Sequence, residues 1–145
     1  MEVKELDKLI KDIGAVIGFY SCLAEDFKDI NRLISGKRKL VGYSFRFAEL
    51  VGNALESYNN SYAARKHKEA EKKLEYIKTG DSVAKAELQT ELITYKLRVE
   101  EGKSEALYRK VKSQFDTIRD TINSMTQDIS TLKNELHETK IHNNG

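Results

Sequence analysis

The feature that most constrains the fold is a pair of apolar seams, one toward each end of the chain. In each seam, large apolar residues recur three and four positions apart without a break. This spacing places every member on one side of an α-helix, whereas a strand repeats every second residue. The first seam consists of Leu6, Leu9, Ile13, Val16, Tyr20, Leu23, Phe27, Ile30 and Ile34. The second consists of Tyr108, Val111, Phe115, Ile118, Ile122, Met125, Ile129, Leu132 and Leu136.

Composition also favours long helices. The 145 residues include no proline and no tryptophan, and 33% of them are charged. A sandwich or barrel needs many turns, whereas long helices need few turns and many solvated polar faces. We therefore expect an all-α bundle of about four long helices with coiled-coil seams. Two such seams exceed what a slim helical hairpin can bury, which predicts a homo-oligomer.

Glycines suggest where the helices end. We expect a first helix to end near Ser35–Gly36, because glycine is common just past a helix C-terminus. A basic connector, 36–47, leads into a second helix that ends at Thr79–Gly80. Asp81 or Ser82 is the expected N-cap of the third helix, and Gly102 an expected break before the fourth. The predicted regions are an N-terminal amphipathic helix (1–35), a basic connector and helix (36–80) and a two-helix C-terminal oligomerisation region (81–145).

The second seam supplies the expected oligomerisation residues. Its heptad assignment places Phe115, Ile122 and Ile129 at position a, and Ile118, Met125 and Leu132 at position d. The pattern leaves open whether these residues pack within one chain or between chains.

An enzyme is not expected. "SGKRK" (35–39) lacks the glycine-rich loop of a phosphate-binding P-loop, and the three histidines have no metal-ligand spacing to one another or to Cys22. We predict no catalytic residue, metal or cofactor. The lone Cys22, in apolar surroundings, is expected to be buried and indicates a reducing compartment. The apolar run 13–24 is too short to cross a bilayer, so we expect a cytoplasmic protein with no membrane partner.

Positive charge gathers in the middle of the chain, where residues 36–78 carry ten basic and five acidic side chains. On a helix, tyrosines and cations share one stripe between Tyr58 and Tyr76. Cations neutralise phosphates and aromatic rings stack on unpaired bases, so the pattern predicts a site for single-stranded nucleic acid. Its expected residues are Arg65, Lys66, Lys68, Lys72, Lys73, Tyr76, Lys37, Arg38, Lys39 and Tyr62. The alternative is a solvated helix face balanced by Glu69, Glu71 and Glu75.

The segment "EKKLEYIKTG" (71–80) resembles the end of a long helix in the UvsY family of phage recombination mediators. Lys73, Leu74, Glu75, Tyr76 and Gly80 fall on positions of that family's basic Lys-x-Arg-Leu-Asp-Tyr-Tyr-x-Gly signature, with one extra residue before the glycine. "YSFRF" (43–47) is similar to a stretch upstream of the signature. "VAKAELQTELI" and "LYRKVKSQFDTIRDTINSMTQDIS" resemble the family's later helices in order and periodicity. Glu71 and Ile77 depart from the signature.

The resemblance implies a non-enzymatic accessory of homologous recombination. Such proteins form ring-like homo-oligomers, bind single-stranded DNA and help a RecA-like recombinase displace the single-strand-binding protein. The rival interpretation is a coiled-coil interaction protein without a specific DNA function, such as an assembly scaffold, a chaperone or a small phage inhibitor of a host enzyme.

Overall fold

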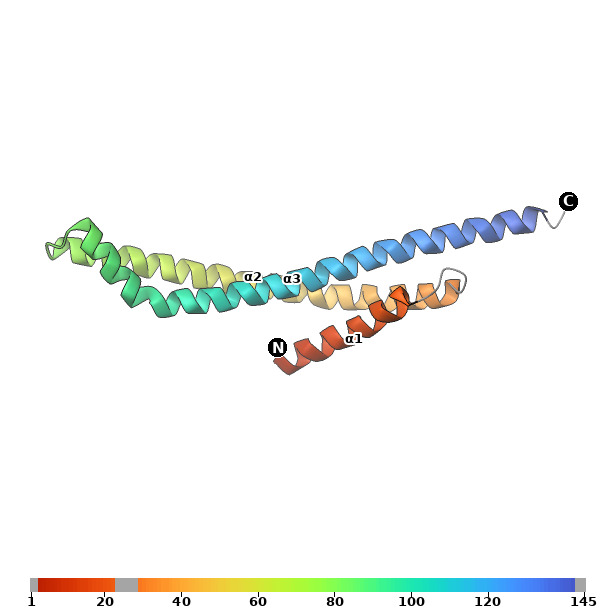
Figure 1. Cartoon of the computed structure of the whole chain (residues 1–145), viewed down its shortest axis with the longest axis horizontal. Coiled ribbons are helices and arrows are strands. Elements are labelled where there is room, and N and C mark those ends of the chain that lie inside the picture. The colour runs from red at the N-terminus through yellow and green to blue at the C-terminus, as the bar shows by residue number, and fades with distance from the viewer. Residues whose placement is uncertain (1–2, 23–28, 143–145) are drawn as a thin grey trace. The chain divides into compact units, whose positions relative to one another are not determined.

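The structure is a computed structural model that describes residues 3–22 and 29–142. Over these residues the chain forms three helices and no strand: α1 (Val3–Ser21), α2 (Ile30–Lys78) and α3 (Val83–His142), shown in Figure 1. The all-α expectation is confirmed, but the described residues form three helices rather than four. They divide into two compact units. We call Met1–Ala48 with Ser113–Gly145 the three-helix unit, and Glu49–Lys112 the hairpin unit.

The three-helix unit has a core of large apolar side chains. It brings α1, the first part of α2 and the last part of α3 together (Figure 1). A Cβ atom added at Gly36 of α2 would lie 3.3 Å from Met125 Cε of α3 and 4.0 Å from Val16 Cγ1 of α1. Gly36 therefore lies where the three helices meet. The buried apolar residues of this unit are Leu6, Leu9, Ile13, Leu33, Leu40, Phe47, Ile118, Met125 and Ile129.

Three expectations at this end of the chain are wrong. Ser35 and Gly36 do not end a helix, because α2 runs through them and through the whole expected connector. A glycine inside a helix costs about 1 kcal/mol relative to alanine, and Gly36 is tolerated where a neighbouring helix needs the space. The first seam is also not one helix, since α1 ends at Ser21. The expected burial of Cys22 is wrong as well, because Cys22 lies exposed in the turn that follows α1. Leu23 and Phe27 lie outside the described residues.

The hairpin unit contains the end of α2, a tight turn and the start of α3. Gly80 has a φ of 98°, a left-handed conformation that favours glycine. Its N–H donates to the Ile77 carbonyl and the Asp81 N–H donates to the Tyr76 carbonyl, both at 3.1 Å. These two bonds form a Schellman motif. Ser82 Oγ accepts a bond of 3.4 Å from the Lys85 N–H, so the expected helix end and N-cap are confirmed.

Gly102 does not break the chain, because α3 is continuous through it. The expected third and fourth helices are therefore one. A Cβ atom added at Gly102 would find no other heavy atom within 4 Å, so the side of α3 on which Gly102 lies is open.

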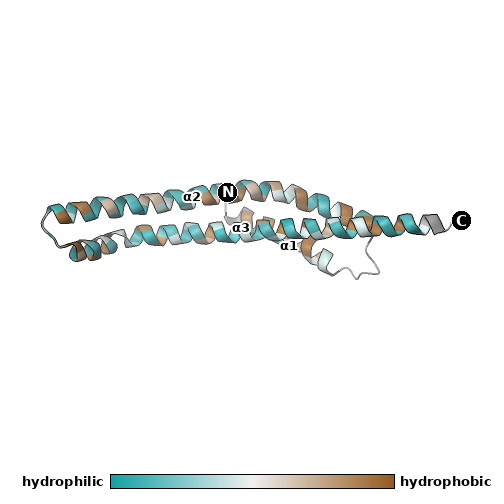
Figure 2. Cartoon of the chain, turned by 90° about the horizontal axis from the view of Figure 1, so that it is seen from above, coloured by the Kyte–Doolittle hydropathy of each residue, from teal (hydrophilic) through white to brown (hydrophobic). Residues whose placement is uncertain are grey.

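The interior of the hairpin unit is thin and largely polar. Its buried residues are Ala54, Ala86, Val111, Arg65, Thr90 and Thr94. An apolar seam of α3 lies on the outside of the hairpin unit, on the opposite side of the helix from Thr90 and Thr94. We call its members Leu88, Leu92, Tyr95 and Val99 the outer seam; they are 66%, 79%, 65% and 39% exposed. Polar and apolar residues accordingly alternate along both helices (Figure 2).

Candidate nucleic-acid interface

The predicted basic stripe of the hairpin unit is balanced by carboxylates. Four of its lysines each lie beside a glutamate, in the pairs Lys66–Glu69 (3.4 Å), Lys68–Glu71 (2.8 Å), Lys72–Glu75 (2.5 Å) and Lys73–Glu87 (2.5 Å). The hydrogen bond from Lys68 holds the pKa of Glu71 below its ordinary value, and the bond to Glu75 raises the pKa of Lys72. A lysine that already neutralises a carboxylate adds little positive potential for a phosphate backbone. The alternative interpretation, a balanced helix face, describes this stripe well.

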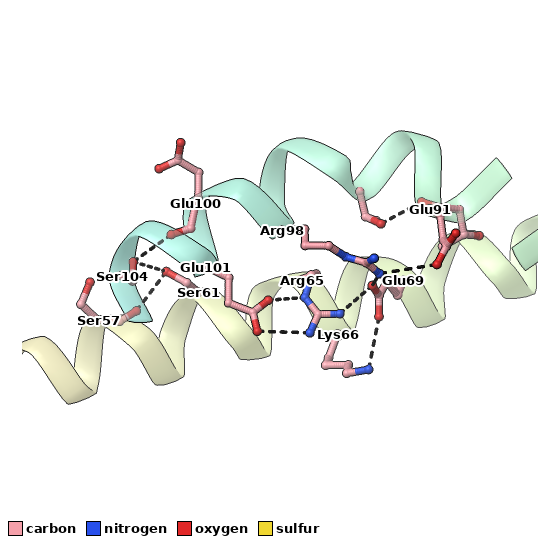
Figure 3. A network of polar contacts seen from close by, with 12 residues as sticks. Ser57, Ser61, Arg65, Lys66, Glu69, Glu91, Arg98, Glu100, Glu101 and Ser104 are labelled. Carbon is pink, nitrogen blue, oxygen red and sulfur yellow. Dashed lines mark hydrogen bonds and ion pairs between the residues drawn. The ribbon is translucent and has the colours of Figure 1, made fainter. Parts of the chain in front are cut away.

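Arg65 has a structural role within the hairpin. Only 9% of the residue is exposed, and its guanidinium connects the two helices. Nε and Nη2 donate to the two carboxylate oxygens of Glu101 on α3, with Nη2 at 3.2 Å from Oε1, and Nη1 donates to Glu69 at 2.7 Å (Figure 3). A bidentate pair of this kind is a strong charge-assisted contact. Each of the three guanidinium nitrogens of Arg65 thus already donates to a carboxylate, and its predicted phosphate contact stays a prediction.

Both carboxylates of this network are stabilised in the charged form. The hydrogen bond from Arg65 holds the pKa of Glu101 below its ordinary value. Burial raises the pKa of Glu69, but the hydrogen bond and charge of Arg65, together with Lys66, outweigh burial and leave that pKa lowered. Arg98 of α3 extends the network, with Nη2 at 3.5 Å from Glu69 Oε1.

Serines continue the polar contact between the helices on the other side of Arg65 (Figure 3). The hydroxyl oxygens of Ser61 and Ser104 lie 3.2 Å apart. Tyr58 and Tyr108 stack nearby with ring centroids 6.4 Å apart. The two helices of the hairpin are thus joined by specific polar and aromatic pairs rather than by a broad apolar core.

The two predicted tyrosines have different surroundings. Tyr62 is 44% exposed, and its ring centroid lies 5.4 Å from Arg65 Cζ and 5.9 Å from Lys66 Nζ. It remains accessible to a ligand. The half-buried Tyr76 lies in the last turn of α2, where its carbonyl accepts bonds from the Asp81 N–H and the Thr79 hydroxyl.

The second part of the predicted site, Lys37, Arg38 and Lys39, lies in the three-helix unit. Residues 30–48 of α2 contain five basic and no acidic side chains. Within the described part of the chain, no ion pair engages Lys37, Arg38, Lys39 or Arg46. Lys37 and Arg38 line a shallow groove of about 430 Å³ together with Lys133 of α3 and the apolar residues Ile34, Val41 and Ile129. These cations are available to an anion, unlike those of the hairpin unit.

Phe45 stands on this basic face and was missed by the sequence analysis. It is 75% exposed, and it lies seven residues after Arg38, which places both on one side of α2. Arg46 is seven residues after Lys39 in the same way. The signal that could have identified Phe45 is its helical position opposite Leu40 and Phe47, which are fully buried. We call Arg38, Lys39, Phe45 and Arg46 the Phe45 face.

The predicted oligomerisation residues pack inside the three-helix unit. Ile118, Met125 and Ile129 are 0%, 2% and 9% exposed, and Phe115, Ile122 and Leu132 are half-buried. The most buried part of the second seam therefore closes within the chain, and Ile118 and Met125 offer no free surface to a second copy.

Among the described residues, no three His, Cys, Asp or Glu side chains gather as metal ligands would. None of the three helices combines the length and apolar character that a membrane span requires, again for the residues described. No protein-family model matches the chain, and neither a curated protein nor a solved structure matches it.

Proposed function

We propose that this chain is a non-enzymatic protein that binds single-stranded DNA through the Phe45 face. The observation that carries the proposal is the combination of a largely exposed aromatic ring with cations that no carboxylate of the described chain neutralises. Cations along a helix follow the phosphate backbone, and an exposed ring gives an unpaired base a surface on which to stack.

The local geometry of α2 supports a base at this position. Gly42 lies between Arg38 and Phe45 on the same side of the helix, and a Cβ atom added there would meet no other heavy atom within 4 Å. The surface beside the ring is therefore open. Lys37 and Lys133, in the adjoining groove, extend the positive charge from α2 to α3.

Fluorescence anisotropy of a labelled oligo-dT, measured at two salt concentrations with duplex DNA as competitor, tests the proposal. Phe45→Ala removes the stacking ring and is expected to weaken binding by about 1–3 kcal/mol. Phe19→Ala is the matched control, because Phe19 is an exposed phenylalanine on α1 (53%). Equal losses in both variants, or no loss in Phe45→Ala, would contradict the proposal.

A second pair of variants separates the two basic segments. Arg38→Gln with Lys39→Gln removes two unpaired charges, whereas Lys72→Gln with Lys73→Gln removes two cations that lie beside glutamates. If each lost phosphate contact lowers the salt slope by about 0.7, the first variant loses about 1.4 of the slope. The second is expected to bind almost as the unaltered chain does. The opposite ranking would return the site to the hairpin unit.

The narrower form of the proposal is a recombination mediator that acts as a homo-oligomer with a RecA-like recombinase and a single-strand-binding protein. It rests on the resemblance of residues 71–80 to the UvsY signature. Its test is whether the chain accelerates exchange of a single-strand-binding protein for a RecA-like recombinase on oligo-dT, and whether Phe45→Ala abolishes that effect.

A second candidate function, an interaction protein without a DNA role, is favoured by a different observation. The outer seam exposes four apolar side chains in helical register. Absence of oligo-dT binding at low salt would make this candidate the leading one.

A further inference from the structure

The outer seam is an apolar helix face without a partner in the hairpin unit. Leu88, Leu92, Tyr95 and Val99 recur at four, three and four positions, which is a heptad pattern. Leu88, Leu92 and Tyr95 line a shallow groove of about 560 Å³, with Glu91 and Arg98 along its edge. The hairpin contacts of α3, at Thr90, Thr94 and Glu101, lie on the opposite side of the helix. An exposed apolar stripe with charged borders is typical of a protein-interaction surface.

The charges beside the seam indicate what covers it. With Leu92 and Val99 at position a and Leu88 and Tyr95 at position d, Glu91 and Arg98 both fall at position g. They already pair weakly with one another in the chain, at 3.7 Å and with more than half of each side chain exposed. In an antiparallel pair of helices, g positions face g positions. Glu91 of one copy then faces Arg98 of the other, and the twofold axis repeats the contact.

We propose that the outer seam binds a second copy of this chain as an antiparallel, twofold-symmetric helix pair. In that register Leu92 packs against Tyr95 of the second copy, and Leu88 against Val99 of the second copy. At each end, Lys85 lies opposite Gly102 of the second copy, where the missing side chain leaves room for the lysine stem. The patch is complementary to itself, as a twofold interface requires.

A parallel pairing is disfavoured by the same residues. In a parallel coiled coil each g position faces the following e position of the other helix. Glu91 would then face Lys96 of the second copy favourably, but Arg98 would face Lys103 of the second copy and repel it. The antiparallel arrangement has two attractive contacts and no repulsive one among these positions. The interface also belongs to the hairpin unit, whereas the seam residues Ile118 and Met125 belong to the three-helix unit.

Charge-swap variants test both the interface and its direction. Glu91→Arg places arginine at positions 91 and 98, and Arg98→Glu places glutamate at both. Position 91 of one copy faces position 98 of the other in the antiparallel pair, so each variant on its own brings like charges together. We expect each to self-associate on the order of tenfold more weakly than the unaltered chain, because both symmetry-related contacts change from attractive to repulsive. An equimolar mixture of the two restores both attractive contacts and is expected to form a heterodimer. Sedimentation equilibrium gives the masses, and energy transfer between differently labelled variants reports the mixed pair.

Three further measurements keep the test decisive. Glu135→Arg makes the same charge change at an exposed position of the three-helix unit and is expected to leave self-association unaltered. Arg98 also lies 3.5 Å from Glu69, so circular dichroism must show that Arg98→Glu remains folded. Leu92→Lys avoids that contact, alters the most exposed seam residue and is expected to abolish self-association.

A monomeric unaltered chain at high protein concentration would overturn the proposal. A dimer that Leu92→Lys leaves intact would also overturn it. If Arg98→Glu strengthened self-association, the helices would pair in parallel and the antiparallel register would be wrong.

Discussion

The hydroxyl of Tyr20, on α1, donates a hydrogen bond of 2.8 Å to Oδ2 of Asp128 on α3. The two residues are 108 positions apart in the sequence, so this bond fixes α1 against the far end of the chain within the three-helix unit. Burial, together with the bond to Asp128 and its negative charge, raises the pKa of Tyr20 to about 12. The stability that this contact gives to the three-helix unit is therefore lost at alkaline pH.

Tyr20→Phe is expected to lower the free energy of unfolding by about 1 kcal/mol at neutral pH, the usual net contribution of one hydrogen bond. Because the folded pKa is raised from 10.0 to about 12, the protonated tyrosine favours the folded state. Its contribution is complete below pH 10 and is lost as the pH rises toward 12. Urea denaturation of both proteins across this interval measures the effect. Tyr62→Phe, which alters a tyrosine that is 44% exposed and lies outside the outer seam, is the control. The same alkaline loss in Tyr20→Phe and the unaltered chain would show that Tyr20 is not its source.

Arg65→Met is expected to destabilise the hairpin unit by about 3 kcal/mol, because it leaves Glu69 and Glu101 facing one another with little solvent. Lys72→Met removes a cation from the exposed surface pair with Glu75 and is expected to cost less than about 1 kcal/mol. Hydrogen exchange of the amides between Thr90 and Ser104 measures the local stability. Similar protection in the two variants would mean that the Arg65 network contributes no more than a surface pair.

The same network predicts sensitivity to acid. Arg65 lowers the pKa of Glu101, so the stabilising pair is complete above the ordinary pKa of a glutamate and is lost as the pH falls through the lowered value. In Arg65→Met this component of the acid dependence should disappear from the exchange rates near Glu101.

The apolar spacing in the sequence was sufficient to predict helices, but not what covers each one. Periodicity reports which side of a helix is apolar, but not what covers that side. Ile118 and Leu92 fit the pattern equally well, although Ile118 is buried within the chain and Leu92 is exposed. The turn at Gly80 was predictable because a glycine followed by N-cap residues is typical of a helix end. Gly80 has the left-handed backbone conformation that such an end requires. Gly36 was misassigned because glycine serves equally well as a helix end and as a close contact between helices.

The sequence predicted the positive charge of the candidate site, but not which of its cations lie beside a carboxylate. Lysines at 66–73 and at 37–39 look alike in a count of basic residues. The difference is that carboxylates one turn away, and Glu87 from the facing helix, lie beside the first group. Arg65 could not be distinguished from its neighbours, because its partner Glu101 is 36 positions away and is brought close only by the hairpin.

Gly36 provides a test of the three-helix contact. Gly36→Leu is expected to destabilise the chain by about 1–3 kcal/mol, because the new side chain must displace Met125, whose Cε would already lie 3.3 Å from a Cβ atom. Gly42→Leu adds the same side chain to the same helix in open space and should be neutral or stabilising. Thermal unfolding of both variants gives the comparison. If the two substitutions had the same effect, the close approach of α1, α2 and α3 at Gly36 would be incorrect.

Gly80 and Gly102 are expected to respond to alanine with opposite signs. Gly80 has a φ of 98°, and an L-residue in the left-handed region is disfavoured by about 1–2 kcal/mol, so Gly80→Ala should destabilise the hairpin turn. Gly102 lies within α3 with open space around its Cα atom. Gly102→Ala should therefore stabilise the chain by about 0.5–1 kcal/mol, since alanine loses less backbone entropy in a helix. Denaturant unfolding of the two variants, at protein concentrations below those at which the chain self-associates, measures both values. Stabilisation by Gly80→Ala would mean that the two long helices are not joined by this Schellman turn. Destabilisation by Gly102→Ala would support the helix break that the sequence predicted at that residue.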